Sequence, residues 1–516
     1  MIAINLATSF LIATTIWTIL ILWALHKYFV KPYIKLQRSK KYKGGLFLYR
    51  PIIGLLRETK EDGITHGDSA YSIKKRVVDD PSLRFAATTF LDKVQLQLYD
   101  PELVKQFLNK DTVTTAKYND IFPKLSDFLM NGLVFTQGEH WKRQRKLLSQ
   151  VFHFDYMNSS LPTIRATTKE WIEKNCKNSS ASTPVNVSKE LKMFTSTVLW
   201  RIFFGEDRFD QTQNAHKTVE LILGNIKTSR DLAISIWNIL FGPKFFKLGL
   251  RSIDRKFNRE KKEIKSLFYS KFEQLRAEYN ERCKNGAVAQ EPAKFKNLIE
   301  LLLEQPEGLP DIEIISQIFT FFLAGTDTTS ELLTISHYFL GTHPEIQTKL
   351  REEILAQIGK IEEITYDHIS KLEYLNAFIK EALRVGGPVP MAGLRVATKD
   401  FMLGDIEIEK GTFLQGTLAG AAHSSKYFSE PEKFRPERWI EKTDRGTVET
   451  STHLPFSAGA RRCIGEQLAL IESKVMLCEL IRQFNIELKT PFDLKMRVGI
   501  VYHAEPDVHV IYTPFS

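Results

Sequence analysis

Cysteine is scarce in this sequence, and the four that occur are scattered without pair spacing: Cys176, Cys283, Cys463 and Cys478. This pattern offers no readable disulfide framework or zinc knuckle, and it fits a reducing compartment. The twelve histidines include no His-x-x-x-His pair that could hold a metal ion. The net charge of +10 comes without a basic helix interleaved with aromatic residues, so no nucleic-acid partner is expected. The charge fits a basic flank beside a membrane anchor, or a basic face for an acidic partner.

Charged residues are absent from Leu6 to Leu25, which is close to the ~20 residues needed to cross a bilayer core. A basic run follows at once, so the positive-inside rule places the C-terminal side in the cytoplasm. A cleaved signal peptide would have a shorter apolar run, preceding charge and a small-residue cleavage site, none of which is seen. We expect residues 1–30 to form a membrane anchor whose helix ends at Pro32, residues 31–44 a basic hinge, and residues 45–516 one large domain.

Cys463 has the sequence environment of a thiolate. It follows a glycine-bearing loop and precedes an apolar stretch, Ile464 to Phe484, that we expect to be helical. Backbone N–H groups and the dipole at a helix N-terminus favour negative charge, and Arg461 and Arg462 should lower the thiol pKa further. Such a thiolate is a metal ligand, a nucleophile or a redox thiol. The alternative is an inert cysteine buried at the start of a helix.

The loop from Phe456 to Gly465 has the pattern Phe-x-x-Gly-x-Arg-x-Cys-x-Gly. It resembles the haem-binding loop of the cytochrome P-450 superfamily at every fixed position. The resemblance implies that Cys463 is the axial thiolate ligand of a haem b iron and that Arg461 pairs with a haem propionate. A thiolate axial ligand pushes electron density onto the iron and favours cleavage of the O–O bond.

The stretch from Asp311 to Phe339 is the clearest helix in the sequence, and apolar residues wrap much of its circumference. It contains Ala324-Gly325-Thr326-Asp327-Thr328-Thr329, although a glycine and an acid are both costly inside a buried helix. A threonine bonded back to the preceding turn and a capped acid would be the structural explanation. The segment is also similar to the family's Ala/Gly-Gly-x-Asp/Glu-Thr-Thr motif. That resemblance implies room for dioxygen and substrate beside Ala324 and Gly325, with Asp327 and Thr328 delivering protons.

Trp141 and Arg145 lie four residues apart in a basic stretch that begins at Gly138, so they share one face of the expected helix. A solvated basic helix with one buried tryptophan would explain them structurally. Similar proteins have Trp-x-x-x-Arg in this region, which implies that both side chains reach a haem propionate. The resemblance also assigns a propionate to Arg395, in an expected strand from Leu394 to Asp400.

Glu381 and Arg384 lie three apart on an expected helix, a spacing that is common in surface ion pairs worth ~0–1 kcal/mol. In similar proteins a downstream arginine, here Arg438, joins this pair in a buried network that steadies the haem loop. Gly386-Gly387-Pro388 departs from the family pattern, which often has a bulky residue and two prolines there. The two stretches expected to form the substrate pocket, residues 112–130 and 389–393, are apolar and carry no group that identifies a substrate.

Together these motifs are typical of a membrane-anchored eukaryotic microsomal cytochrome P-450, mainly α with a small β-rich region. The resemblance implies a haem monooxygenase that inserts one atom of dioxygen into a lipophilic small molecule such as a fatty acid, sterol or xenobiotic. Electrons would come from NADPH through a separate flavoprotein reductase, with cytochrome b5 as a further candidate, at the endoplasmic reticulum membrane. Two alternatives stay open: a haem-thiolate isomerase or dehydratase, and a non-catalytic haem carrier or sensor.

Overall fold

A computed structural model describes residues 2–51, 54–69, 71–110, 114–117, 132–152, 158–205, 221, 224, 248–285, 297–304, 308–441, 452–498 and 501–515. The chain forms two compact units, which are described in turn. The first comprises Met1–Tyr118 and Met391–Ser429, and the second comprises Asn119–Pro390 and Glu430–Ser516. Most of the expected pocket stretch at residues 112–130 lies outside the described residues.

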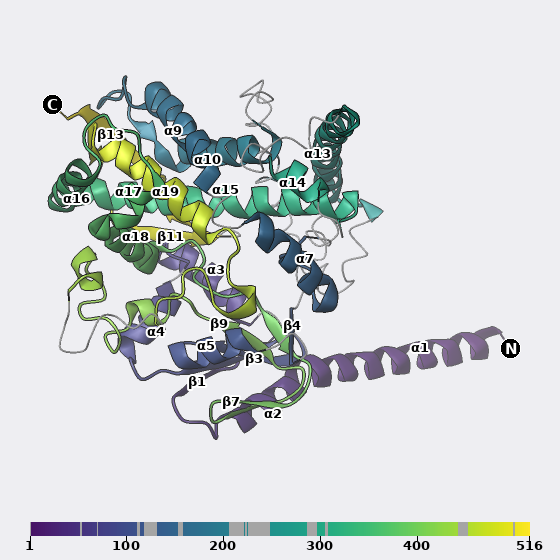
Figure 1. Ribbon diagram of the computed structural model, residues 1–516. Helices are drawn as coiled ribbons and strands as arrows, with labels where there is room; N and C mark the ends of the chain where they lie inside the picture. The colour runs from purple at the N-terminus through teal and green to yellow at the C-terminus, as the bar shows by residue number, and fades with distance from the viewer. Residues whose placement is uncertain are drawn as a thin grey trace. The chain divides into compact units, whose positions relative to one another are not determined.

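The first unit begins with a continuous helical run of α1 (Ile2–Leu25), the π-helical turn η1 (His26–Val30) and α2 (Lys31–Ser39) (Figure 1). The helix over Phe10–Ser39 is long and apolar enough to cross a membrane, and none of its apolar window is buried. The helix does not end at Pro32 as predicted. Pro32 lies in the first turn of α2, directly after the π-helical turn, where a missing N–H is tolerated.

A six-stranded sheet organises the rest of the first unit, with the strand order β1-β2-β3-β9-β6-β4. β1 pairs with β2, and β3 with β9, in parallel; the other neighbours are antiparallel. A separate hairpin joins β7 (Phe401–Leu403) to β8 (Ile406–Ile408). The sheet strands are β1 (Gly45–Leu48), β2 (Phe85–Phe90), β3 (Lys93–Leu98), β4 (Thr115–Lys117), β6 (Arg395–Ala397) and β9 (Phe413–Gly416); the helices are α3 (Leu55–Thr65), α4 (Tyr71–Asp79), α5 (Pro101–Asn109) and the 3₁₀ turn η7 (Ala421–His423).

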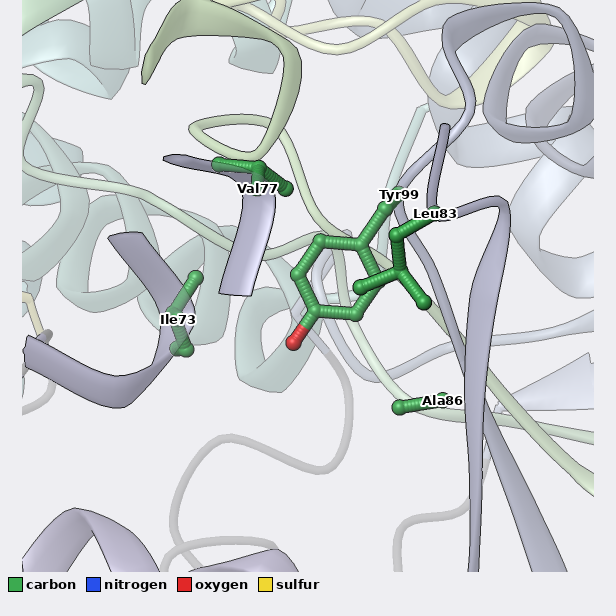
Figure 2. Close-up of a cluster of buried hydrophobic side chains, with 5 residues drawn as sticks. All are labelled: Ile73, Val77, Leu83, Ala86 and Tyr99. Carbon is green, nitrogen blue, oxygen red and sulfur yellow. The ribbon is translucent and has the colours of Figure 1, made fainter. Parts of the chain in front are cut away.

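A small apolar core holds α4 against this sheet. Figure 2 shows Ile73 and Val77 of α4 beside the ring of Tyr99, with Leu83 and Ala86 on its other side. The spacing of four residues from Ile73 to Val77 places both on one helix face. The Tyr99 hydroxyl is not left unpaired, since it accepts a hydrogen bond from Arg76 Nη1 at 3.0 Å.

The second unit is mostly helical and is built around α15 (Asp311–Thr342), which packs on α10, α18 and α19 (Figure 1). Its sheets are small, with the orders β10-β13-β5 and β11-β12. Its elements are α7 (Gly138–Val151), α9 (Leu161–Asn175), β5 (Val185–Asn186), α10 (Val187–Phe204), α13 (Ser252–Lys284), α14 (Leu298–Leu303), α16 (Pro344–Gln357), α17 (Tyr366–Lys371), α18 (Glu373–Gly386), η8 (Pro436–Trp439), η9 (Gly459–Arg461), α19 (Glu466–Ile481), β10 (Phe484–Leu488), β11 (Lys495–Val498), β12 (Tyr502–Glu505) and β13 (His509–Pro514).

Aromatic side chains fill the contact between α10, α13 and α15. The ring of Phe268 on α13 lies 5.4 Å from Phe319 and 5.9 Å from Phe322, both on α15, between ring centroids and edge to face. Trp200 of α10 contacts Phe204 at 4.5 Å. Such offset and edge-on pairs are the favoured aromatic geometries, so this contact fixes the long helix laterally. The predicted fold class, mainly α with small sheets after one apolar N-terminal helix, is confirmed.

The Gly386-Gly387 departure has a packing explanation. A Cβ on Gly386, the last residue of α18, would lie 2.9 Å from Cγ2 of Ile335 on α15. A Cβ on Gly387 would lie 2.4 Å from the carbonyl oxygen of Leu383. Both positions therefore exclude larger residues, and the two glycines let the end of α18 lie close to α15.

Candidate haem site

The loop before α19 folds back on itself and presents Cys463 at its end. Ser457 and Gly459 both have positive φ, 63° and 70°, and the Cys463 N–H donates to the Phe456 carbonyl at 3.0 Å. The predicted helix from Ile464 to Phe484 is wrong at both ends, because α19 covers Glu466–Ile481 and Phe484 begins a strand. Gly465 occupies the N-cap position, so Ile464 and Gly465 separate the cysteine from the first residue of the helix, and Cys463 does not open it.

The predicted lowering of the Cys463 pKa is also wrong. Burial raises the pKa of this thiol, and this outweighs the opposing effects of the Gly465 N–H, Arg145 and Arg462. Protein atoms surround the sulfur closely, yet part of the side chain stays accessible to solvent. Because burial and the nearby Glu466 carboxylate raise the pKa of this thiol, a free nucleophilic thiolate is disfavoured, whereas a cationic metal centre would stabilise the deprotonated sulfur directly.

Trp141, Arg145 and Arg461 lie around this loop, and the first two are one turn apart on α7, as their spacing predicts. The Arg461 guanidinium lies over the Trp141 ring, 3.9 Å from its centroid. Its Nη2 donates to the Thr136 carbonyl at 2.9 Å, which fixes the side chain in the loop before α7. Arg145 lies one turn after Trp141 on α7. Burial lowers the pKa of Arg145, while the nearby Cys463 thiolate would raise it, so the two side chains interact electrostatically.

A short accessible patch interrupts the otherwise buried surface of α15. Ala324 is exposed, and Leu323, Gly325 and Thr328 are half-buried, whereas the flanking turns are almost entirely buried. The Thr328 hydroxyl donates to the Ala324 carbonyl at 2.7 Å, the back-bonded arrangement considered above as the structural explanation. Its oxygen keeps lone pairs that can accept a hydrogen bond. Gly325 has a packing role as well, since a Cβ there would lie 2.9 Å from Leu199 on α10.

Asp327 points into the protein, where it meets two cationic side chains. Its Oδ1 lies 3.3 Å from Lys192 Nζ on α10, and its Oδ2 lies 3.3 Å from His503 Nε2 on β12. His503 Nδ1 is also 3.1 Å from Glu331, one turn further along α15. Burial alone would raise the pKa of Asp327, but His503 and then Lys192 lower it overall. Sequence reasoning missed Lys192, His503 and Glu331, because no motif marks them and they come from distant segments.

The His503 contacts make an alkaline loss of stability expected. Burial would lower the pKa of His503, but its hydrogen bonds to Asp327 and Glu331 raise it to about 9. A folded-state pKa above the unfolded value of ~6.5 contributes stability that is complete below about pH 6.5 and is lost as the pH rises through about 9. Thermal unfolding measured from pH 6 to 10 should show this loss, and His503→Gln should remove most of it. An identical pH dependence in the variant would contradict the assignment.

Glu381, Arg384 and Arg438 form the predicted buried network. Arg384 donates to both carboxylate oxygens of Glu381, at 2.9 and 2.8 Å, and Arg438 Nε donates to Glu381 Oε1 at 3.0 Å. The exposed fraction of all three side chains is 3% or less. Burial would raise the pKa of Glu381, but the hydrogen bond and charge of Arg384 lower it overall. The ionised carboxylate is therefore fully paired inside the protein.

A chain of contacts joins this network to the segment that leads to Cys463. Trp439 Nε1 donates to Glu381 Oε2 at 2.9 Å, and the Trp439 ring lies 4.7 Å from the imidazole of His453. On the other side, Phe434 stacks on Phe339 of α15 at 3.8 Å. The segment from Phe434 to Trp439 therefore holds α15, α18 and the start of the cysteine loop together.

Arg395 belongs to the first unit, where it is buried on β6. Its Nη1 donates to the carbonyls of Phe107 and Lys110 and to the Thr115 hydroxyl, each at 3.4 Å. Its guanidinium also lies 4.9 Å from the Phe107 ring centroid. These contacts fix the side chain within its own unit, and its contact with a propionate stays a prediction.

The donor set of the second unit fits a haem. Cys463 supplies one accessible sulfur, and Trp141, Arg145 and Arg461 are N–H donors of the kind that bind carboxylates. Within the described part of the chain, no group of three or more His, Cys, Asp or Glu side chains is arranged to hold a bare metal ion. The loop and the accessible patch of α15 thus have the features expected of a haem-thiolate protein.

Comparison with known proteins agrees with this class. The family model described as Cytochrome P450 matches residues 88–510. Similar curated proteins include cytochrome P450 3A13 of Mus musculus, 27% identical over 80% of this chain and 81% of the relative, and cytochrome P450 734A1 of Arabidopsis thaliana, 27% identical over 76% and 73%. Cytochrome P450 4A10 of Rattus norvegicus is 26% identical over 76% of each chain. The chain belongs to the cytochrome P450 family and is a haem-dependent monooxygenase.

Proposed function

We propose that Cys463 is the axial ligand of a haem b and that Trp141, Arg145 and Arg461 hold its propionates. The accessible Cys463 sulfur, with Arg145 and the stacked Arg461–Trp141 pair beside it, is the observation that carries this assignment. When bound there, the haem would supply the iron that binds and activates dioxygen. Glu381, Arg384 and Arg438 act through Trp439 by holding the loop in place.

Thr328 and Asp327 have different roles in this proposal. Thr328 faces the accessible patch, and its oxygen can accept a hydrogen bond from a water that carries a proton toward the reaction. Asp327 is held by Lys192 and His503 on the buried side, and no direct hydrogen bond joins it to the Thr328 hydroxyl among the described residues. Asp327 therefore takes part in a proton path on the buried side of α15, and it does not pass a proton directly to the Thr328 hydroxyl.

The substrate we propose is a lipophilic small molecule, such as a fatty acid, a sterol or a xenobiotic. The apolar helix α1 supports residence in a membrane, where such molecules dissolve. The basic run after it supports a single-pass anchor in the endoplasmic reticulum membrane, with the catalytic domain on the cytosolic side.

Electrons would come from NADPH through a membrane-bound flavoprotein reductase, with cytochrome b5 as a further donor. Helix α7, which carries Trp141 and Arg145, also exposes Lys142 and Lys146. These exposed cations lie on the same helix as Arg145 and would attract an acidic partner surface. The net charge of +10 would also attract an acidic partner at long range.

Intact microsomes that contain this protein and a flavoprotein reductase test both the electron source and the topology. We expect NADPH added from outside to support oxidation of lipophilic substrates, and protease added from outside to abolish it. Activity that appears only after detergent treatment would place the catalytic domain on the lumenal side. Substrate turnover without NADPH or oxygen would instead favour an isomerase, and haem binding without any turnover would favour a carrier or sensor.

A further inference from the structure

A basic cavity of about 300 Å³ lies in the first unit, directly after the apolar helix. Its walls are α2, the β2–β3 hairpin and residues 406–412 around β8. Nine of the lining side chains are charged, and six of these are cationic, which gives the lining a formal charge of +3. The cations are Lys31, Lys35, Arg38, Lys41, Lys93 and Lys410, and the acids are Asp92, Glu407 and Glu409.

The acids do not neutralise this cavity. Glu409 pairs with Lys35 at 2.8 Å, and Glu407 pairs with Lys41 at 3.2 Å. The other four cations, Lys31, Arg38, Lys93 and Lys410, have no ion pair with any described residue, and Asp92 is the one remaining acid in the lining. Four like charges repel one another around a shared space, so an anion inside it would be bound favourably.

The position of the cavity along the chain indicates where such an anion would come from. Lys31, Lys35 and Arg38 recur at helical spacing on one face of α2, while Pro32 and Leu36 are buried and Val30, Tyr33 and Ile34 are exposed. Lys31 is six residues past Leu25, which is about 9 Å along a helix axis. The polar layer on each side of a bilayer is roughly 5–8 Å thick. The start of the cavity therefore lies at about the outer edge of the headgroup layer.

The interface itself is marked by aromatic and cationic side chains just before the cavity. Lys27 Nζ lies 4.6 Å from the Trp23 ring centroid and 5.2 Å from that of Tyr28. Tyr33 packs edge-on against Tyr49 at 5.1 Å, and both rings are exposed. Tryptophan and tyrosine are enriched at the level of lipid headgroups, so this belt sets the depth of α2.

We infer that this cavity binds the phosphate-bearing headgroup of an anionic phospholipid in the leaflet nearest the catalytic domain. The inference rests on the membrane anchorage proposed above. Phosphate oxygens would accept hydrogen bonds from the unpaired lysines and from Arg38. Lys93 and Lys410 distinguish this site from a simple basic tail, because the fold brings them to α2 from distant segments.

The test uses the full-length protein in phosphatidylcholine vesicles that contain a minor fraction of phosphatidylserine. After gentle detergent extraction at raised salt, the phosphatidylserine retained per protein is measured. Lys93→Gln/Lys410→Gln should retain about 25-fold less than wild type, taking each cation near the membrane as worth about fivefold. The matched control, Lys40→Gln/Lys43→Gln, removes the same charge from exposed residues that do not line the cavity, and it should retain phosphatidylserine within twofold of wild type.

Three outcomes would overturn the inference. Equal losses of retained phosphatidylserine in both variants would show that the lipid is held only by diffuse attraction to a basic segment. Salt screens such an attraction. No retained phosphatidylserine in wild type would show that there is no site. Displacement of the lipid by inorganic phosphate alone would assign the cavity to soluble phosphates. Failure of the proposed membrane anchorage can be distinguished from failure of the lipid site, because the wild-type protein would then not enter the vesicles at all.

Discussion

Arg384→Ala is expected to yield protein that is haem-free or aggregated. The substitution leaves the Glu381 carboxylate, buried and ionised, without its bidentate partner. Breaking a buried ion pair by removing one member costs about 3–5 kcal/mol, a large share of the ~5–15 kcal/mol that stabilises a typical folded protein. The loss also removes hydrogen bonds from Arg384 to the carbonyls of Pro431 and Lys433. Haem content per protein and the soluble yield are the measurements.

Arg435→Ala is the matched control for this prediction. It removes a guanidinium from the same segment, but one that is half-exposed and lies 3.6 Å from Glu441, and it keeps the backbone N–H that donates to Glu381. We expect it to cost less than about 1 kcal/mol and to keep its haem. An Arg384→Ala protein with a soluble yield and haem content equal to the control would reduce the network to an ordinary ion pair.

Thr328→Ala is expected to separate NADPH consumption from product formation. Oxygen activation consumes protons, and Thr328 is the hydroxyl that faces the accessible patch of α15. Alanine keeps the helix and the small size but removes the oxygen that can hold a proton-carrying water. A positioned proton-transfer group is worth about 100-fold or more, so product per NADPH should fall at least several-fold while hydrogen peroxide rises.

The control for Thr328 lies on the same helix. Thr334 makes the same back-bond, from its hydroxyl to the Ser330 carbonyl at 2.8 Å, but it is buried away from the patch. Thr334→Ala should leave the ratio of product to NADPH unchanged. Haem content and substrate binding should match wild type in both variants, and unchanged coupling in Thr328→Ala would exclude the proposed role.

The motifs made much of the second unit predictable. The spacing of Glu381 and Arg384 on one helix face, and of Trp141 and Arg145 on another, follows from helix geometry alone. The buried character of α15 follows from its apolar circumference. Each of these features depends on residues that are close together in the sequence, so a sequence pattern can predict it.

Features that depend on distant segments were not predictable. The partners of Asp327 come from α10 and β12, and the explanation for Gly386 is a side chain on α15. The start of α19 was missed because the loop closes through the Cys463 N–H bond to Phe456, which keeps Cys463 out of the helix. Pro32 did not end its helix because a π-helical turn precedes it.

The absorption spectrum of the reduced protein with carbon monoxide tests most directly whether Cys463 ligates a haem. Wild type should show the strongly red-shifted Soret band of thiolate-ligated haem, and Cys463→His should lose it because imidazole donates less charge. Cys478 is the next candidate, but it is fully buried inside α19, where burial raises its pKa. A red-shifted band that persists in Cys463→His would contradict the assignment.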